Sequence, residues 1–341
     1  MEGRYVEMMG TAKVLAETCM QIQKGEQVLI LTDWNYQECL GGAALQEAII
    51  STLNGMDAEV LTLFMKAREG HGELPPIICQ AMKMADAVIT VPTEGLTHTQ
   101  ALKDAMAAGT RVLMMPCAGE VGNHDEIILK MMPKSKEEIT MLATLSLKVE
   151  EIVHIAREIR LVTELGTDFT LCVGPAGTIL GDWGACTGIL TPGRAQHIPT
   201  WQLAFGVEQG SAEGRFVVDG SISPMGRPLK EPVTFTVKAG YIVDITGGGD
   251  AAYYKSLMEA ADNPDVYNIA ELGFGTNPKG KITGHPLGDE RLYGSAHIGM
   301  GSNVVLGGDI LADWWHEDAT FSKVTAYADG KLFMDRGEFV F

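Results

Sequence analysis

Two potential metal ligands stand two residues apart near the end of the chain, at His316 and Asp318. Alternate side chains of an extended strand point to the same face, so an imidazole and a carboxylate would project together here. Such a pair can form half of a site for a divalent metal. Taken alone, the triplet His-Glu-Asp would more often lie in a surface loop.

Two further segments each carry one polar side chain among small and apolar residues. Glu271 stands in NIAELGFG (268–275), where an ionised carboxylate needs a partner. His297 stands in YGSAHIGMG (293–301), whose glycines let the backbone pack closely around a site. Either residue could be an ordinary core residue held by a salt bridge or a hydrogen bond. Together with the first pair, they make four candidate ligands in one strand-rich stretch.

Three other side chains are candidates for catalysis or substrate binding. Glu290 in GDERLYG and Glu208 in GVEQG could supply an acid or a base. His197, close to Pro199 and Trp201, could face a cleft and bind substrate. The alternatives are a solvated or salt-bridged role for the two acids and ordinary packing for the histidine. We expect no dinucleotide cofactor, because no G-x-G-x-x-G sequence follows the first apolar run.

The elements that must position these residues begin with a repeated unit of an apolar run and a helix-length segment. This alternation is typical of buried parallel strands with crossover helices. The runs cover 28–33, 58–64, 86–92 and 111–116. A long helix is predicted over 135–161, where apolar residues recur at helical spacing without Gly or Pro.

After Thr163 the pattern changes to strand-like runs that end at Gly and Pro. One of them, VTFTVKAGYIVDITGGGD, predicts a hairpin that turns at 238–240, followed by a helix over 251–261. We therefore predict an α/β protein with two domains. Residues 1–163 form a domain around a mostly parallel sheet, and residues 164–341 form a strand-rich domain that carries the metal site.

Length and composition agree with a globular protein of about two domains. The chain has 341 residues, of which 46% are hydrophobic, and its formal net charge is −18. A phosphate backbone would be repelled by this charge, so we expect no nucleic-acid partner. No stretch approaches about twenty apolar residues, and the first residues are partly acidic, so we expect no membrane partner and a cytoplasmic location.

Five segments, in this order along the chain, carry a resemblance to a known family. They are GSAEGRFVVDGSI (210–222), ITGGGDA (245–251), DNPDVYNIAELGFGTN (262–277), GDERLYGSAHIGMG (288–301) and HED (316–318). The sequence resembles the aminopeptidase T family of metallopeptidases, of the leucyl aminopeptidase type. Relatives of that family include the iron-dependent 2,5-dihydroxypyridine dioxygenases of nicotinate breakdown. The resemblance covers most of the chain and implies a homodimer with the active site in a deep cleft.

The resemblance also implies a set of metal ligands. The ligand positions of the peptidases are occupied here by Glu271, His297, His316 and Asp318. In the dioxygenases, His316 and Asp318 match two iron ligands, and Glu271 stands where the third, a histidine, is expected. Two positions depart from the peptidases, because Gln202 replaces a further metal-binding Glu and Val304 replaces a catalytic Tyr. This shorter set implies one divalent ion, which could be Zn, Mn, Co or Fe(II).

Three functions follow from the resemblance, the first two with a small-molecule substrate. We expect a metal-dependent hydrolase of an amide or peptide-like bond, with a metal-bound water as nucleophile, because Glu271 and His297 are peptidase-like. The alternative is an Fe(II)-dependent ring-cleaving dioxygenase acting on a dihydroxypyridine-like aromatic, since two histidines and a carboxylate can form a facial triad. A third is an inactive, metal-binding member, which Gln202 and Val304 would explain.

Overall fold

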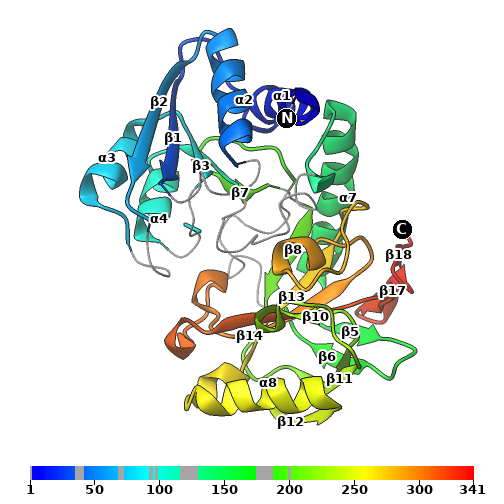
Figure 1. Cartoon of the computed structure of the whole chain (residues 1–341). Helices are drawn as coiled ribbons and strands as arrows, with labels where there is room; N and C mark the ends of the chain where they lie inside the picture. Colours follow the sequence, from blue (N-terminus) through cyan, green and yellow to red (C-terminus); the bar gives the residue numbers. More distant parts are fainter. Residues whose placement is uncertain are drawn as a thin grey trace. The chain divides into compact units, whose positions relative to one another are not determined.

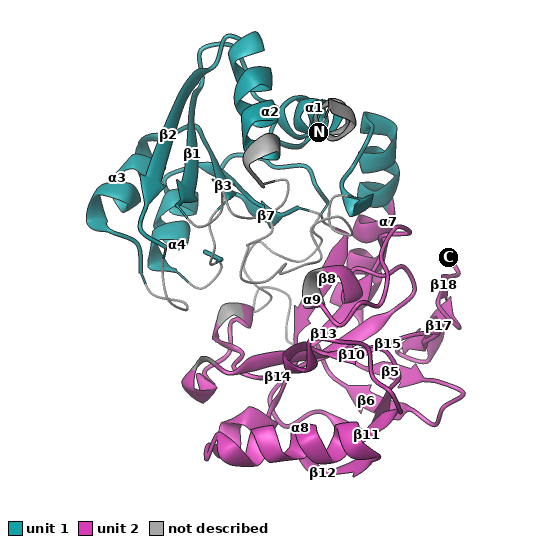
Figure 2. Ribbon diagram, viewed as in Figure 1, with its two compact units in different colours: residues 1–144, 186–200 teal, residues 145–185, 201–341 magenta. Residues whose placement is uncertain are grey.

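The computed structural model describes residues 2–34, 42–67, 73–91, 95–96, 99–115, 130–173, 187–198 and 201–341. Their contacts divide the chain into two compact units, coloured separately in Figure 2. Unit 1 comprises residues 1–144 and 186–200, and unit 2 comprises residues 145–185 and 201–341. The predicted domain boundary near residue 163 stays a prediction, because compact contact units need not coincide with independently folding domains.

Unit 1 is built on a five-stranded parallel sheet with the order β2-β1-β3-β4-β7 (Figure 1). All of its ladders are parallel. The predicted apolar runs form the first four strands, of which β1, β3 and β4 are buried along nearly their whole length, whereas β2 at the edge of the sheet is largely exposed or half-buried. The strands are β1 (Gln27–Asp33), β2 (Glu59–Met65), β3 (Ala87–Val91), β4 (Arg111–Met114) and β7 (Ala195–His197).

Helices connect these strands in the manner expected of right-handed crossovers. The chain moves from β1 to β2 in one direction and then back past β1 to β3 and on to β4. This reversal places α2 and α3 on opposite faces of the sheet, whereas α3 and α4 pack against each other on one face. The helices are α1 (Glu2–Val14) with the π-helix η1 (Leu15–Cys19), α2 (Gly42–Gly55), α3 (Pro76–Met84) and α4 (Gln100–Ala107).

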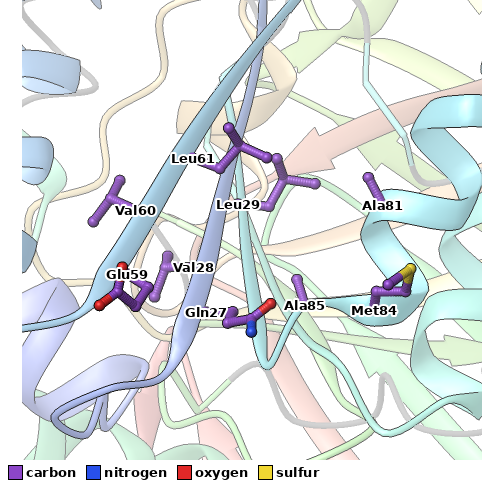
Figure 3. A pocket seen from close by; sticks show the side chains of 9 residues that line it. All are labelled: Gln27, Val28, Leu29, Glu59, Val60, Leu61, Ala81, Met84 and Ala85. Atoms are coloured by element: carbon purple, nitrogen blue, oxygen red, sulfur yellow. The ribbon is translucent and has the colours of Figure 1, made fainter.

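A largely apolar groove lies in unit 1 between α3 and the neighbouring strands β1 and β2 (Figure 3). Leu29, Leu61 and Met84 line it, together with the polar side chains of Gln27 and Glu59. None of the candidate ligands or catalytic residues lines this groove. The chemistry predicted from the sequence therefore has to be sought elsewhere.

The predicted long helix is confirmed in most of its length as α7 (Lys136–Ile155), but its last part is wrong. Residues 159–162 form strand β5 (Ile159–Val162) instead. Ile159 and Leu161 are fully buried and alternate with exposed Arg160, which is the period of a half-buried strand. The Asp329 carboxylate also accepts hydrogen bonds from the backbone N–H groups of residues 157 and 158, just before the strand.

Unit 2 contains two sheets. An eight-stranded sheet has the order β12-β11-β9-β6-β5-β16-β17-β18, and a five-stranded sheet has the order β10-β15-β14-β13-β8. The further strands of the larger sheet are β6 (Asp168–Leu171), β9 (Glu213–Val218), β11 (Val233–Lys238), β12 (Tyr241–Gly247), β16 (Thr325–Ala328), β17 (Lys331–Asp335) and β18 (Glu338–Phe339). The smaller sheet, which we call the ligand sheet, consists of β8 (Gln202–Gly206), β10 (Ser221–Ile222), β13 (Ile269–Gly275), β14 (Ala296–Gly301) and β15 (His316–Phe321).

Short helices link these strands. They are η4 (Ser223–Met225), α8 (Gly249–Ala260), η5 (Pro264–Tyr267), α9 (Pro286–Asp289), η6 (Val304–Leu306) and η7 (Ala312–Trp314). The predicted hairpin is present as β11 and β12, and its turn residues Ala239 and Gly240 both have positive φ. The α/β fold class, with a parallel sheet followed by strand-rich antiparallel sheets, is confirmed.

The main core of unit 2 contains residues from both of its sheets. Phe216 stacks on Phe235 within the larger sheet, with ring centroids 4.7 Å apart, and lies 6.2 Å from Phe321 of the ligand sheet. Leu272 and Ile298 of the ligand sheet belong to the same buried cluster. Because alternate residues of a strand face opposite sides, one face of the ligand sheet packs on this core and its other face is left for polar residues.

A partly buried salt bridge, with Asp250 buried and the Arg227 side chain partly exposed, holds the start of α8 in unit 2. Asp250 accepts hydrogen bonds from both Arg227 guanidinium nitrogens, at 2.6 and 3.1 Å, and from the Lys230 N–H at 2.7 Å. The bond from Arg227 is the main cause that lowers the pKa of Asp250 from 3.8 to about 2. The carboxylate also lies in the first turn of α8, where the helix dipole favours negative charge.

We expect Asp250→Asn to lower the free energy of unfolding at pH 7 by at most about 2 kcal/mol, from about 1.36 kcal/mol per pKa unit. The folded pKa lies below the unfolded one, so this contribution is present above about pH 4 and is lost as the pH falls toward 2. Urea unfolding at pH 7, 5 and 3.5 checks this. Asp244→Asn is the matched control, since Asp244 is exposed and lies 3.9 Å from Lys255. The prediction would be contradicted if both variants lost the same free energy of unfolding, or if the loss in Asp250→Asn did not depend on pH.

Candidate metal centre

Strand register brings the four predicted ligands to one face of the ligand sheet. Glu271 on β13 is paired with Gly299 on β14, and Gly299 is paired with Asp318 on β15. His297 lies two residues before Gly299, and His316 lies two residues before Asp318. Since side chains alternate with period two and paired residues share a face, all four point to the same side. The opposite side is the core face.

Glycines make the space that these side chains occupy. A Cβ at Gly273, which is paired with His297, would overlap the imidazole of that histidine. A Cβ at Gly299 would lie 2.7 Å from the Glu271 Cβ and 2.9 Å from His316 Nε2. Real Cβ atoms do not approach other atoms so closely, so no other residue fits at these positions without a local shift.

The four side chains form one compact cluster. His297 Nε2–H donates to Glu271 Oε1 at 3.1 Å, and His316 Nε2 lies 3.3 Å from Glu271 Oε2 and 3.8 Å from Asp318 Oδ1. One ligand atom each of Glu271, His297 and Asp318 lie within 4.8 Å of one another. The side chains of His316 and Asp318 are 18% and 15% exposed, so the cluster can be reached from solvent.

The backbone fixes the orientation of the His316 ring. His316 Nδ1–H donates to the carbonyl oxygen of Ser302 at 2.7 Å. Nε2 therefore faces the two carboxylates. A histidine held in this way, with its outer nitrogen bonded to a carbonyl, is typical of metal ligands.

Burial and mutual charge shift the pKa values within the cluster. Burial favours neutral Glu271, but hydrogen bonds from His297 and His316 outweigh it and lower the pKa of Glu271 to about 2. Burial also favours the neutral form of His316, but the negative charges of Asp318 and Glu271 outweigh it and raise the pKa of His316 to about 10. Burial raises the pKa of Asp318, and its Oδ1 is a buried atom without a hydrogen-bond partner.

Glu290 lies beside this cluster with its carboxyl held by Gln202. Gln202 Nε2 donates to Glu290 Oε2 at 3.0 Å, and Arg291 Nη1 lies 3.6 Å from the same oxygen. Burial first, and then the negative charge of Asp318, raise the pKa of Glu290 to about 8. A neutral carboxyl group therefore stands next to a candidate ligand at neutral pH.

The loop that carries Glu290 is anchored by the preceding residue. Asp289 is fully buried and accepts hydrogen bonds from the Ser221 hydroxyl at 2.6 Å, the Thr283 N–H at 2.6 Å and the Gly284 N–H at 2.8 Å. Gly275 lets this loop pass close to β13, because a Cβ there would overlap the backbone near Leu292. The hydrogen bonds of Asp289 and the close contact of this loop with β13 thus fix the position of Glu290.

The other residues named from the sequence, Glu208, His197 and Val304, lie outside the strands of the ligand sheet. Glu208 is exposed just after β8, and its backbone N–H bonds to the Cys172 carbonyl. His197 ends β7 in unit 1 and is partly buried. Val304 begins η6. The roles suggested for these residues, and those of the four ligands, stay predictions.

Sequence reasoning did not identify Ser302, and it named Gln202 only as the replacement of a metal-binding Glu, not as the partner of Glu290. Ser302 acts through its backbone carbonyl, which leaves no mark in a sequence. Gln202 and Glu290 are 88 residues apart. The spacing of glycines was a usable signal, because Gly273 and Gly299 each lie two residues from a candidate ligand.

A cluster of two imidazoles and two carboxylates on a glycine-lined sheet face is the kind of site that metalloenzymes use. The chain belongs to the family described as NicX, 2,5-dihydroxypyridine 5,6-dioxygenase, whose model matches residues 11–341. A 2,5-dihydroxypyridine 5,6-dioxygenase of Pseudomonas putida KT2440 is 27% identical over 274 residues, which cover 76% of this chain and 73% of that protein.

Two solved structures share the fold over nearly the whole chain. The 2,5-dihydroxypyridine dioxygenase of P. putida KT2440 matches with a TM-score of 0.78 and 21% identity, covering 98% of this chain and 97% of the other. AmpT of Thermus thermophilus matches with a TM-score of 0.65 and 12% identity, covering 98% and 99%. At these identities the matches establish the fold alone.

The predicted hydrolase is wrong. Family membership and the curated relative both point to a dioxygenase, which was the alternative. The error arose because Glu271 and His297 were taken as evidence for a peptidase. Imidazole and carboxylate groups bind the metals of hydrolases and of oxygen-using enzymes alike. Within the part of the chain that the structure describes, no helix is long and apolar enough to cross a membrane.

We expect Gly273→Ala to prevent His297 from keeping its position, because the added methyl group would overlap the imidazole. Overpacking of this kind costs roughly 1–3 kcal/mol of stability. Thermal unfolding and metal content after loading with a divalent ion check this. Gly249→Ala is the control, since Gly249 begins α8 and nothing lies within 4 Å of its added Cβ. Normal metal content in Gly273→Ala would count against the arrangement described here.

Proposed function

We propose that the chain is an Fe(II)-dependent dioxygenase that opens the ring of a hydroxylated pyridine. Family membership over residues 11–341 supports the reaction class, and the curated relative, a 2,5-dihydroxypyridine 5,6-dioxygenase, supports the substrate class. The observation that carries the proposal is the buried cluster around Glu271 on the ligand sheet.

The residues present fit a divalent metal. Glu271, His316 and Asp318 would hold it, with His297 bonded to Glu271 or joining them as a fourth ligand. Asp318 Oδ1 is buried without a hydrogen-bond partner, which is costly for a carboxylate unless a cation binds it. His316 presents Nε2 to both carboxylates, as a ligand must.

Fe(II) held by histidine and carboxylate ligands supplies open coordination positions for a hydroxylated ring and molecular oxygen. Glu271 distinguishes this chain from the dioxygenases that it resembles, which are expected to use a histidine at this position. A carboxylate in place of a neutral histidine would favour binding of a hard cation. It would also make the total charge of the ligands more negative. The other residues of the site must then bind and orient the ring.

Glu290 is suited to move a proton during ring opening. Because Oε2 accepts a hydrogen bond from Gln202, the acid proton belongs on Oε1. The carboxyl also hydrogen-bonds to Asp318, so the proton would pass to a substrate atom once a metal holds Asp318. Gln202 and the Asp289 anchor hold this group in place, so little motion is needed for the transfer. The homodimer and the cytoplasmic location stay predictions.

Anaerobically loaded Fe(II) protein is expected to consume oxygen in proportion to 2,5-dihydroxypyridine, followed by an oxygen electrode and by loss of ring absorbance. His316→Ala should reduce turnover by at least about 100-fold, because it removes an iron ligand. His154→Ala is the control, since His154 lies on α7 and faces Glu150 at 3.9 Å. Ring loss that is independent of oxygen, or unchanged turnover in His316→Ala, would refute the proposal.

Glu290→Gln should lower kcat on the order of 100-fold while changing KM much less, because the amide keeps the shape but cannot give up a proton. Steady-state kinetics under oxygen-saturated conditions measure this. Glu151→Gln, an exposed change on α7, serves as the control. Equal kcat values for Glu290→Gln and wild type would remove Glu290 from the mechanism.

A further inference from the structure

We propose that Asn268 is a positioning residue of the metal centre, which acts on His316 through the backbone of residues 301 and 302. The inference rests on the metal site proposed above. Asn268 is fully buried immediately before β13 and does not belong to the cluster of candidate ligands. Its effect would be carried by its hydrogen bonds to Gly301, by the covalent link from Gly301 to Ser302, and by the hydrogen bond from His316 to Ser302.

The first step is an exchange of hydrogen bonds between Asn268 and Gly301. The Asn268 carbonyl accepts from the Gly301 N–H at 2.8 Å, and Asn268 Nδ2 donates to the Gly301 carbonyl at 2.9 Å. In an ordinary antiparallel pair this second donor would be the backbone N–H. The backbone N–H of Asn268 instead bonds to the Asp265 carbonyl at 3.1 Å, so the side-chain amide takes its place.

The second step concerns the freedom of Gly301. This residue ends β14 with a φ of +101°, and a Cβ there would overlap the Trp315 carbonyl. A glycine at this point has the widest choice of backbone conformations. Hydrogen bonds to Asn268 on both of its polar groups restrict that choice and fix the direction in which the chain leaves the sheet.

The third step reaches the ligand. Ser302 follows Gly301, its N–H bonds to the Trp315 carbonyl at 2.7 Å, and its own carbonyl accepts from His316 Nδ1–H at 2.7 Å. The Asn268 amide holds the peptide between Gly301 and Ser302, and the Ser302 carbonyl belongs to the next peptide along the chain. A shift of the first peptide would displace the Ser302 Cα, and with it this carbonyl, and so loosen the ring. The Asn268 amide thus helps to keep His316 Nε2 aimed at Glu271 and Asp318.

The chain offers a matched control for the loss of an amide. Asn263 lies five residues earlier, at the start of η5, and donates from Nδ2 to Asp313 Oδ2 at 2.7 Å. This bond ties two exposed segments together and does not involve residues 301 and 302. Asn263 Oδ1 also accepts from the Asp265 N–H at 2.9 Å as the N-cap of η5. Asn263→Ala therefore reports what the loss of side-chain hydrogen bonds just before β13 does while the Asn268 amide is kept.

Zinc(II) is the probe, because it is diamagnetic and accepts imidazole and carboxylate ligands. Zinc affinity is measured by competition with a chromophoric chelator. The His316 signal and the proton exchange at its Nδ1 are followed by ¹⁵N-histidine NMR of the zinc-loaded protein. Asn268→Ala removes the donor, and Asn268→Leu removes it while filling the same space. We expect both to bind zinc about 10- to 100-fold more weakly than wild type. Proton exchange at His316 Nδ1 should become faster.

Asn263→Ala is expected to bind zinc within about twofold of wild type, with an unchanged His316 signal. The inference is overturned if the Asn268 variants bind zinc as tightly as Asn263→Ala, or if exchange at His316 Nδ1 does not change. Zinc binding by wild type without oxygen-dependent turnover would count against the proposed function alone. Absence of zinc binding by wild type would overturn both proposals.

Discussion

Compensation of buried negative charge is the constraint on which the ligand sheet depends. Glu271 and Asp318 stand on a face where an isolated carboxylate would be strongly unfavourable. Two imidazoles compensate them in the structure, and the pKa shifts of Glu271 and His316 in opposite directions express that mutual stabilisation. A divalent cation offers the same compensation in one step. The proposed affinity for a metal would therefore be a property of the arrangement as a whole.

The same constraint explains why small residues and backbone groups surround the cluster. Four polar side chains on adjacent strands need lateral room, and Gly273 and Gly299 provide it by lacking a Cβ. Glycines weaken a strand, so the sheet has to be held from its other face, where Leu272 and Ile298 pack in the core. Tethers such as the Ser302 carbonyl then restore the rigidity that glycine removes.

Much of the fold could be predicted from the sequence, because it follows from local patterns. Buried parallel strands appear as continuous apolar runs, and the hairpin at Ala239 and Gly240 requires residues that accept positive φ. The end of the predicted helix failed at Ile159, where an apolar spacing compatible with a helix also fits a strand. Candidate ligands stood out as polar residues in apolar surroundings. Their tethers did not, because main-chain carbonyls and contacts between distant residues have no local signature.

The reaction class could not follow from the ligands, and the surroundings of Glu290 show why. A carboxylate at position 202, where the resemblance implies a glutamate in the peptidases, would face Glu290 across the distance now spanned by a 3.0 Å hydrogen bond. Two carboxylates so close would repel each other unless a second cation lay between them. With Gln202 the same space is filled by a neutral amide that donates to a carboxyl whose burial already favours its protonated form. In the proposed site, glutamine at position 202 would thus replace a reason for a second metal with a proton donor held beside the first. That exchange would suit the proposed chemistry, in which one metal and one acid act together on a small aromatic ring.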